Sequence, residues 1–280
     1  MRVLLMRYHE GELEMQRRAG VRELADRVSR IIAAEIPPVA AAFVAAQPFV
    51  IAATVDASGA PTASLLGGAP GFVTATDART LTITPTFGHR VFDDVDSTGI
   101  IGLLAIDLAT RRRMRVNGTA VRRGDSIIVT TREVYSNCPQ YIHPRVFAPV
   151  ALREASPDVI ASADTFFIAT SHLGSGHPAR SASSTASGRM PDASGLEARP
   201  PSADASHRGG PAGFVRVESP TRLSWPDYPG NNMFNSLGNL VVNPRCALLF
   251  VDFDRGAALQ LRGRAVVRGD AERVVVFESE

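Results

Sequence analysis

The residues best suited to chemistry lie in two polar segments of the second half of the chain. Residues 204–210 read Asp-Ala-Ser-His-Arg-Gly-Gly, so a hydroxyl, an imidazole and a guanidinium precede two glycines. Glycines allow backbone N–H groups to approach an anion closely. Residues 225–232 read Trp-Pro-Asp-Tyr-Pro-Gly-Asn-Asn and lead into an expected helix at 233–240, whose N-terminal N–H groups also favour an anion. Together the two segments favour a phosphate site.

Turns without a ligand are the alternative interpretation of both segments. Asn231 or Asn232 would then cap the helix, while Asp204 and Ser206 would shape a bend. The aligned residues of the first half are Ser-Leu-Leu at 64–66, so such a turn needs neither the imidazole nor the guanidinium. Because only the second half of the chain is enriched in polar residues at these positions, a ligand site is favoured over a simple turn.

Composition excludes several classes of protein. All 30 basic residues are arginine, so Schiff-base chemistry, a lysine base and a P-loop are excluded. The formal net charge is only +2, which gives no strong field for nucleic acid or anionic lipid. The six histidines are scattered, and two cysteines form neither a disulfide framework nor a CxxC pair. We therefore expect no metal site, no nucleic-acid partner and no membrane partner.

The chain contains an internal repeat. Residues 67–73 return at 209–215 with five of seven residues identical, and residues 115–125 return at 260–270 with six of eleven identical. The matches keep their order at offsets of 142 and 145, which indicates a duplicated domain. An upstream match between residues 48–54 and 165–171 has an offset of only 117, so the second copy carries extra residues.

These patterns predict a mainly β fold with flanking helices (α+β). Residues 1–47 should form a helical segment, with helices near 21–32 and 39–46, before a strand at 49–55. Residues 48–150 and 151–280 should form two tandem split β-barrels packed as a pseudo-twofold pair, because each copy has about six short strands with glycine turns. The extra residues, about 174–203, are rich in Ser, Ala, Gly and Pro, and we expect a disordered insertion with no part in the chemistry.

Three features of the first copy lead to further expectations. Residues 84–90 correspond to the Asn231 region and leave a degenerate second site open. Residues 111–113 are three arginines at an expected hairpin corner, where a solvated turn is favoured over an RNA contact. Cys138 has no supporting histidine other than His143, so structural packing is favoured over a nucleophilic role.

The N-terminal apolar run is too short for a signal peptide, and no stretch reaches about 18 apolar residues. Two cysteines also suit a reducing compartment. We expect a soluble, cytoplasmic protein.

Four groups of residues carry a resemblance to a known family: His-Glu-Gly-Glu at 9–12 with Gln16, Asn-Cys-Pro-Gln-Tyr-Ile at 137–142, the run 206–215, and the run 226–245. In these motifs the chain resembles the pyridoxamine 5′-phosphate oxidase-like FMN-binding split-barrel family, in a duplicated form. The resemblance implies a flavin mononucleotide (FMN) between the barrels, with its phosphate held by one and its ring covered by the other.

The resemblance also implies roles for particular residues. Phosphate and ribityl groups would be held from 206–208 and 231–232, residues 225–227 would lie near the ring, and residues 137–141 would reach over it. Arg208 or a backbone N–H would stabilise the reduced flavin anion. Trp225 fits a core position equally well. The predicted cofactor-binding set is Ser206, His207, Arg208, Gly209, Trp225, Pro226, Asp227, Asn231, Asn232, Asn137 and Tyr141.

The resemblance therefore favours an FMN-dependent oxidoreductase, a reductase or oxidase of small molecules, with NADH, NADPH or a partner protein as electron donor. No catalytic residue is assigned, because the chemistry would belong to the flavin. A non-catalytic flavin- or haem-binding sensor and a scaffold without ligand stay open, as does a homodimer. Vitamin B6 oxidation is not expected, since no substrate-binding tail is found. The sequence ends just after its last expected strand, so completeness of the flavin site also stays open.

Overall fold

Each half of the chain folds into one mainly antiparallel sheet. In the computed structural model, which describes residues 8–149, 151–174 and 199–280, the first sheet comprises β1 (Phe49–Val55), β2 (Pro61–Gly67), β3 (Val73–Asp77), β4 (Thr80–Ile83), β5 (Ile100–Asp107), β6 (Arg112–Arg123) and β7 (Ser126–Asn137). The second comprises β9 (Thr165–His172), β10 (Ser202–Gly209), β11 (Arg216–Ser219), β12 (Arg222–Pro226), β13 (Arg245–Asp252), β14 (Ala257–Arg268) and β15 (Val274–Ser279), with β8 (Arg153–Glu154) paired to β14.

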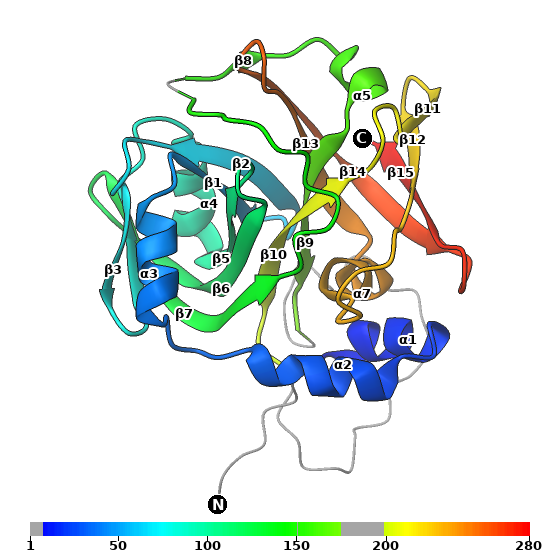
Figure 1. Cartoon of the computed structure of the whole chain (residues 1–280), viewed down its shortest axis with the longest axis horizontal. Helices are drawn as coiled ribbons and strands as arrows, with labels where there is room; N and C mark the ends of the chain where they lie inside the picture. The colour runs from blue at the N-terminus through cyan, green and yellow to red at the C-terminus, as the bar shows by residue number, and fades with distance from the viewer. Residues whose placement is uncertain (1–7, 150, 175–198) are drawn as a thin grey trace, which may run out of the picture.

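The two sheets have the same topology. Their strand orders are β2-β1-β5-β6-β7-β4-β3 and β10-β9-β13-β14-β15-β12-β11, which become identical when each strand is matched to its repeat. The fold class predicted from the sequence, two tandem split barrels, is confirmed. Figure 1 shows the two sheets side by side, with β9 and β10 next to the first sheet.

The two barrels pack through a pseudo-twofold interface. β10 packs against β5 and β6, while its counterpart β2 packs against β13 and β14, as a self-complementary interface requires. β5 is apolar on both faces because each face is buried in a different core. Ile101 and Leu103 point into the first barrel, whereas Ile100 and Leu104 join the core between the repeats. A strand buried on both sides therefore reads as a continuous apolar run.

Helices cover the ends of the barrels: α3 (Pro38–Ala45) and α4 (Val91–Thr98) in the first repeat, and α5 (Val159–Ser162) and α7 (Asn235–Val242) in the second. α3 begins at Pro38 because proline suits the first turn of a helix. α7 begins two residues later than predicted, because Phe234 and Asn232 both have φ near +60° and cannot extend the helix backwards.

The N-terminal segment forms α1 (Glu10–Arg18), α2 (Arg22–Val28) and the 3-10 turn η1 (Ser29–Ile31). The periodicity at 21–32 predicted α2, but not α1, which packs on α7 of the second repeat. The two helices meet at Gly11 and Gly238; a Cβ on Gly238 would lie only 2.6 Å from Glu12 Cα. The capping box of α1, formed by His9 and Glu12, fixes where it begins.

Most of the predicted insertion, 175–198, lies outside the described residues. Its predicted end at 203 is wrong, because Ser202 and Ala203 already belong to β10 and pair with His172 and Ser171 of β9. Arg199 is also largely buried, and it pairs with Glu12 and Glu133. Within the described residues, no helix is long and apolar enough to cross a membrane.

Candidate functional site

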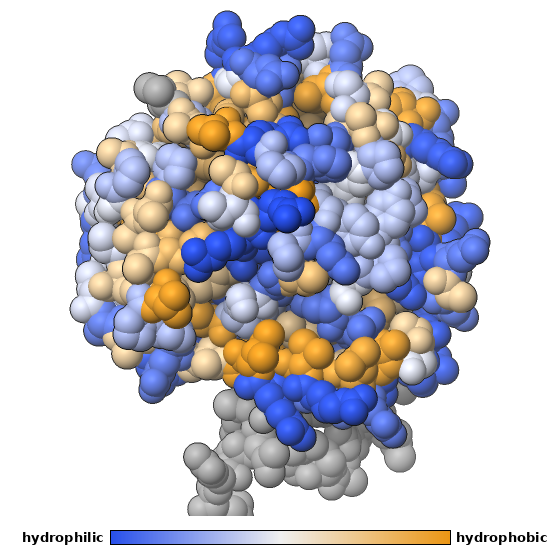
Figure 2. All heavy atoms as spheres, in the orientation of Figure 1, coloured by the Kyte–Doolittle hydropathy of each residue, from blue (hydrophilic) through white to orange (hydrophobic). Residues whose placement is uncertain are grey.

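A polar cleft lies between the two repeats. It consists of two cavities of about 100 and 70 Å³ that share the lining residues Arg115, Arg208, Tyr228, Gly230 and Asn231. The second repeat supplies β10, the end of β12 and the loop before α7, while the first supplies β6 and the segment after β7. Strongly hydrophilic residues also gather near the middle of the face shown in Figure 2, between the two sheets.

The structure brings most of the predicted site residues to this cleft. The larger cavity is lined by Asn137, Tyr141, Ser206, His207, Arg208, Gly209, Pro226 and Asn231, and the smaller by Asp227 and Asn232 as well. Trp225 is the exception. It is only 2% exposed and packs edge-to-face on Phe166, 5.0 Å away, inside the second barrel. Side chains alternate along β12, so a residue next to the cleft-lining Pro226 points to the opposite face.

Sequence reasoning missed two arginines of the cleft. Arg113 was predicted in a solvated hairpin corner, but β6 begins at Arg112, and Arg113 lines the larger cavity with Arg115. Residues two apart on a strand share a face, so both guanidinium groups reach the second repeat. The signal was present in the sequence as arginines at i and i+2 at the start of an expected strand.

The carboxylates of the cleft are already paired. Arg115 Nη1 donates to Asp204 Oδ1 at 2.9 Å, and Arg115 Nη2 donates to Ser206 Oγ. Asp227 accepts from Arg208 Nη1 at 3.2 Å and from Arg273 Nε at 2.9 Å. Each aspartate is therefore paired with at least one arginine.

Arg113 differs from these arginines, because no carboxylate among the described residues pairs with it. Burial, followed by the nearby charges of Arg115 and Arg208, lowers the pKa of Arg113 to about 10. The group stays protonated at neutral pH. A partly buried cation without a counter-charge gives the cleft a positive potential and suits an anionic ligand.

His207 adds a second unsatisfied donor. Its Nδ1 lies 2.9 Å from Arg113 Nη1, and since a guanidinium only donates, Nδ1 must accept and Nε2 carries the hydrogen. Burial, followed by the charge of Arg113, holds the pKa of His207 well below its usual value. His207 Nε2 and Arg113 Nε are buried and have no hydrogen-bond partner among the described residues. Both N–H groups are available to an acceptor.

The first repeat also covers the mouth of the cleft. Tyr141 stacks on Tyr228 with ring centroids 5.1 Å apart, and the side-chain amides of Asn137 and Asn231 lie 3.0 Å apart. Cys138 is exposed and lines the cavity, so the prediction that it packs structurally is wrong. The reason is that the chain after β7 crosses to the second repeat along the cleft and leaves the Cys138 side chain exposed there.

The equivalent place in the first repeat is filled by protein. Phe87, which aligns with Pro229, packs its ring directly against Gly67, where any side chain would clash. Thr86 N–H donates to Gly67 O at 2.8 Å and holds this loop on β2. The degenerate second site that the sequence left open is therefore occupied by an aromatic ring.

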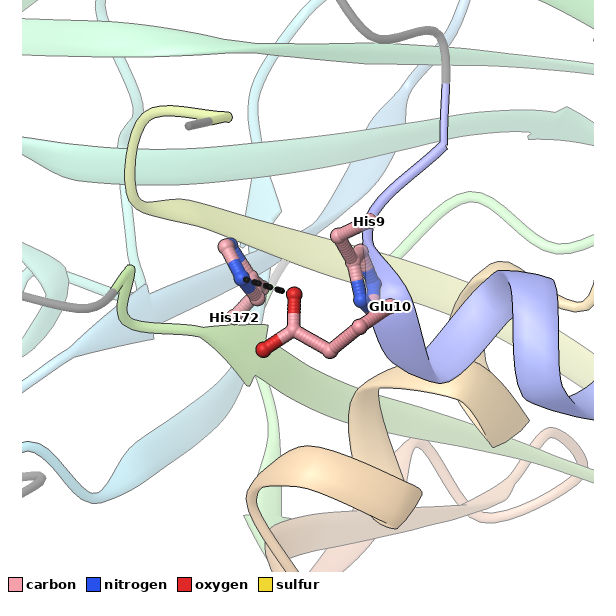
Figure 3. Close-up of side chains that lie close together, drawn as sticks. All are labelled: His9, Glu10 and His172. Carbon is pink, nitrogen blue, oxygen red and sulfur yellow. Dashed lines mark ion pairs between the residues drawn. The ribbon is translucent and has the colours of Figure 1, made fainter. Parts of the chain in front are cut away.

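A cluster of His9, Glu10 and His172, which the sequence treated as scattered, lies where α1 docks on β9 (Figure 3). His9 Nδ1 accepts from Gly11 N–H, and His9 Nε2 lies 2.9 Å from Asn239 Oδ1, so both nitrogens are engaged. The two imidazoles stack at 4.3 Å with planes 18° apart, and lone pairs in nearly parallel planes do not converge on one ion. As arranged, the cluster anchors α1 on the second repeat.

The buried imidazole of His9 gives a testable pH dependence. Burial, with smaller effects of His172 and Arg199, lowers the pKa of His9 from 6.5 to about 2. The unfolded chain therefore binds a proton below pH 6.5 that the folded chain does not. Stability is fully present above pH 6.5 and falls as the pH drops towards 2, by about 1.4 kcal/mol per unit for this group.

Urea unfolding at pH 7.5 and 5.0 measures the effect, with His9→Asn as the comparison because asparagine keeps a capping oxygen. We expect the fall in unfolding free energy to be smaller in the variant by roughly 2 kcal/mol. The raised pKa of buried Glu12 acts in the opposite direction but is present in both proteins. An equal fall of the unfolding free energy in the two proteins would refute the lowered pKa of His9 as the cause of the pH dependence.

Comparison with known proteins agrees with this architecture. Residues 36–134 match the family model described as pyridoxamine 5′-phosphate oxidase. This match covers most of the first repeat, and it confirms the resemblance to the pyridoxamine 5′-phosphate oxidase-like split-barrel family predicted from the motifs.

Similar solved structures include HupZ of Group A Streptococcus, with 18% identity over 34% of this chain and 87% of that one and a TM-score of 0.29. Another is a putative pyridoxamine 5′-phosphate oxidase of Lactobacillus delbrueckii, with 18% identity over 37% and 95% of the chains and a TM-score of 0.30. A third is an FMN-binding protein of Syntrophomonas wolfei, with 8% identity over 44% and 95% and a TM-score of 0.28. No curated protein matches the sequence.

Proposed function

We propose that the protein binds FMN in the cleft between its repeats and uses it as a reductase or oxidase of small molecules, with NADH or NADPH as the electron donor. One observation carries the proposal. Among the described residues no carboxylate pairs with Arg113, and its Nε and the Nε2–H of His207 are buried donors without a partner, at a cavity of about 100 Å³. A phosphate group supplies both the missing charge and the missing acceptors.

Different residues of the cleft suit the phosphate, the ribityl chain and the ring of FMN. Arg113, His207 and Arg208 would hold the phosphate, and Asn231 and Asn232 would bind phosphate or ribityl oxygens. A cavity of about 100 Å³ is smaller than those that enclose whole ligands, typically about 300–1,000 Å³. The stacked pair Tyr141 and Tyr228 offers aromatic faces for the ring at the mouth. When bound, FMN supplies hydride and electron transfer.

The chain's own residues bind and orient in this proposal. Asp204 fixes Arg115, and Asp227 fixes Arg208, so the guanidinium groups are held in place before a ligand arrives. His207 is neutral and donates through Nε2. Within the described cleft no carboxylate is left to move a proton, because both aspartates are paired.

That pairing is also the observation that favours a second candidate, a non-catalytic flavin-binding module. Such a protein needs affinity and orientation but no acid or base. It would bind FMN as tightly as an enzyme does and show no turnover. His207 has no free nitrogen lone pair with which to serve as an axial ligand of haem.

Reconstitution tests the proposal. Purified protein is incubated with FMN or with riboflavin, which lacks the phosphate, and the absorption spectrum is recorded after gel filtration. We expect FMN to be retained and riboflavin to be lost, because the phosphate supplies most of the polar contacts. Retention of neither flavin would refute FMN binding. Steady-state assays of the FMN-loaded protein with NADH, NADPH and artificial acceptors then separate the enzyme from the binding module.

A further inference from the structure

A cavity larger than either cavity of the cleft lies elsewhere in the protein. It has a volume of about 480 Å³, which is in the range of small-molecule pockets, and it shares no lining residue with either cavity of the cleft. It lies where the chain after η1, the turn between β3 and β4, the middle of β6 and β7, and the residues before β10 meet. Its lining is Ser29, Ile32, Ala34, Arg79, Asn117, Gly118, Arg132, Glu133, Arg199, Pro200, Pro201 and Ser202.

The wall of this cavity combines apolar groups with unbalanced positive charge. Ile32, Ala34 and the two prolines at 200–201 provide apolar surface. Glu133 is paired with Arg199, which also pairs with Glu12, so these three groups carry one net negative charge against the two positive charges of Arg79 and Arg132. No carboxylate among the described residues pairs with Arg79 or Arg132; Arg132 Nη1 donates only to Pro201 O, at 3.4 Å. The excess charge favours an anion.

Asn117, which lines the cavity, carries an unsatisfied polar atom. Its side chain is buried, with 3% of the residue exposed, and Nδ2 donates to Glu133 Oε2 at 3.0 Å. Asn117 Oδ1 is buried and has no hydrogen-bond partner among the residues described. Leaving a buried carbonyl oxygen unpaired costs about 1–3 kcal/mol, so such atoms in native proteins call for an explanation.

We propose that this cavity binds a small organic anion with an apolar body, of the class of a medium-chain or aromatic carboxylate. Arg79 and Arg132 hold the anionic end at the rim, and the apolar body lies against Ile32, Ala34 and the prolines. The site is separate from the proposed FMN cleft and does not depend on it.

Octanoate and octylammonium test the charge requirement, because they share a chain and differ in sign. Both are titrated below their micellar concentrations into 15N-labelled protein, and binding is followed through backbone amide shifts. We expect saturable octanoate shifts centred on Asn117, Gly118, Arg132 and Ser202, and no comparable shifts with octylammonium. Absence of saturable octanoate binding, equal binding of the two ligands, or shifts centred elsewhere would overturn the proposal.

Variants separate the charge from the shape of the site. The double substitution Arg79→Gln and Arg132→Gln removes the anion partners, and we expect octanoate affinity to fall at least about tenfold. Ala34→Phe fills the apolar space and leaves both charges, and it should weaken binding as well, with its melting temperature measured to verify folding. Arg255→Gln, at an exposed turn of the second repeat, is the control. Unchanged octanoate affinity in both test variants would contradict the proposal that octanoate binds in this cavity.

Discussion

Substitution of Arg113 by glutamine is expected to weaken FMN binding by roughly tenfold to a hundredfold, because one charge-assisted contact to phosphate is worth about 1.5–3 kcal/mol. Riboflavin affinity should not change, since riboflavin has no phosphate. The apoprotein should be equally or more stable, because the variant no longer buries a cation that no described carboxylate neutralises. Few substitutions are expected to lower affinity for a ligand without lowering stability.

Flavin fluorescence titration gives both affinities, and urea unfolding gives the stability of the apoprotein. Arg112→Gln is the matched control, since Arg112 precedes Arg113 on β6, points to the opposite face and lies over the ring of Phe43. A parallel loss of FMN and riboflavin affinity would mean that Arg113 acts on something other than phosphate. An unchanged FMN affinity would place the phosphate elsewhere.

Substitution of Gly238 by alanine should destabilise the protein by about 1–3 kcal/mol or more, the usual cost of an overpacked contact. Helix propensity alone predicts the opposite, since alanine is favoured over glycine by about 1 kcal/mol within a helix. The added Cβ would lie 2.6 Å from Cα and N of Glu12, which are backbone atoms and cannot rotate away. α1 must therefore move off α7, and the bond from Asn235 Nδ2 to Glu12 Oε1 at 2.6 Å would be lost with it.

Urea unfolding of the two apoproteins measures this difference. Gly230→Ala is the control, because a Cβ there meets no atom within 4 Å and its backbone φ is not positive. We expect the control to differ from the parent by less than about 0.5 kcal/mol. A stabilised Gly238→Ala protein would show that α1 does not pack on α7 as the structure describes.

The repeat made the fold predictable, because two aligned sets of strands with the same order can hardly build different sheets. Local signals also placed β1, where the strand predicted at 49–55 agrees residue for residue. α1 was missed because it is polar on most of its surface, and its place depends on a glycine contact with a helix more than 200 residues later.

The candidate site was harder to predict where it depends on both repeats. The polar segments around His207 and Asn231 are visible in sequence because each is a run of unusual residues in one copy. Arg113 belongs to the site only because β6 of one barrel faces β10 of the other. Trp225 shows the converse, since its place next to a polar loop says nothing about which face of β12 it occupies.

The pseudo-twofold interface has a consequence for how the protein behaves on dilution. In a dimer of separate barrels, the population of paired subunits falls with concentration, and so does every site that both subunits build. Here one chain supplies both faces, so the cleft between β6 and β10 is assembled at any concentration. Because the two repeats are encoded separately within one chain, a substitution in one is not repeated in the other. Phe87 can therefore fill the site of the first repeat, while the aligned Pro229 leaves the cleft of the second repeat open.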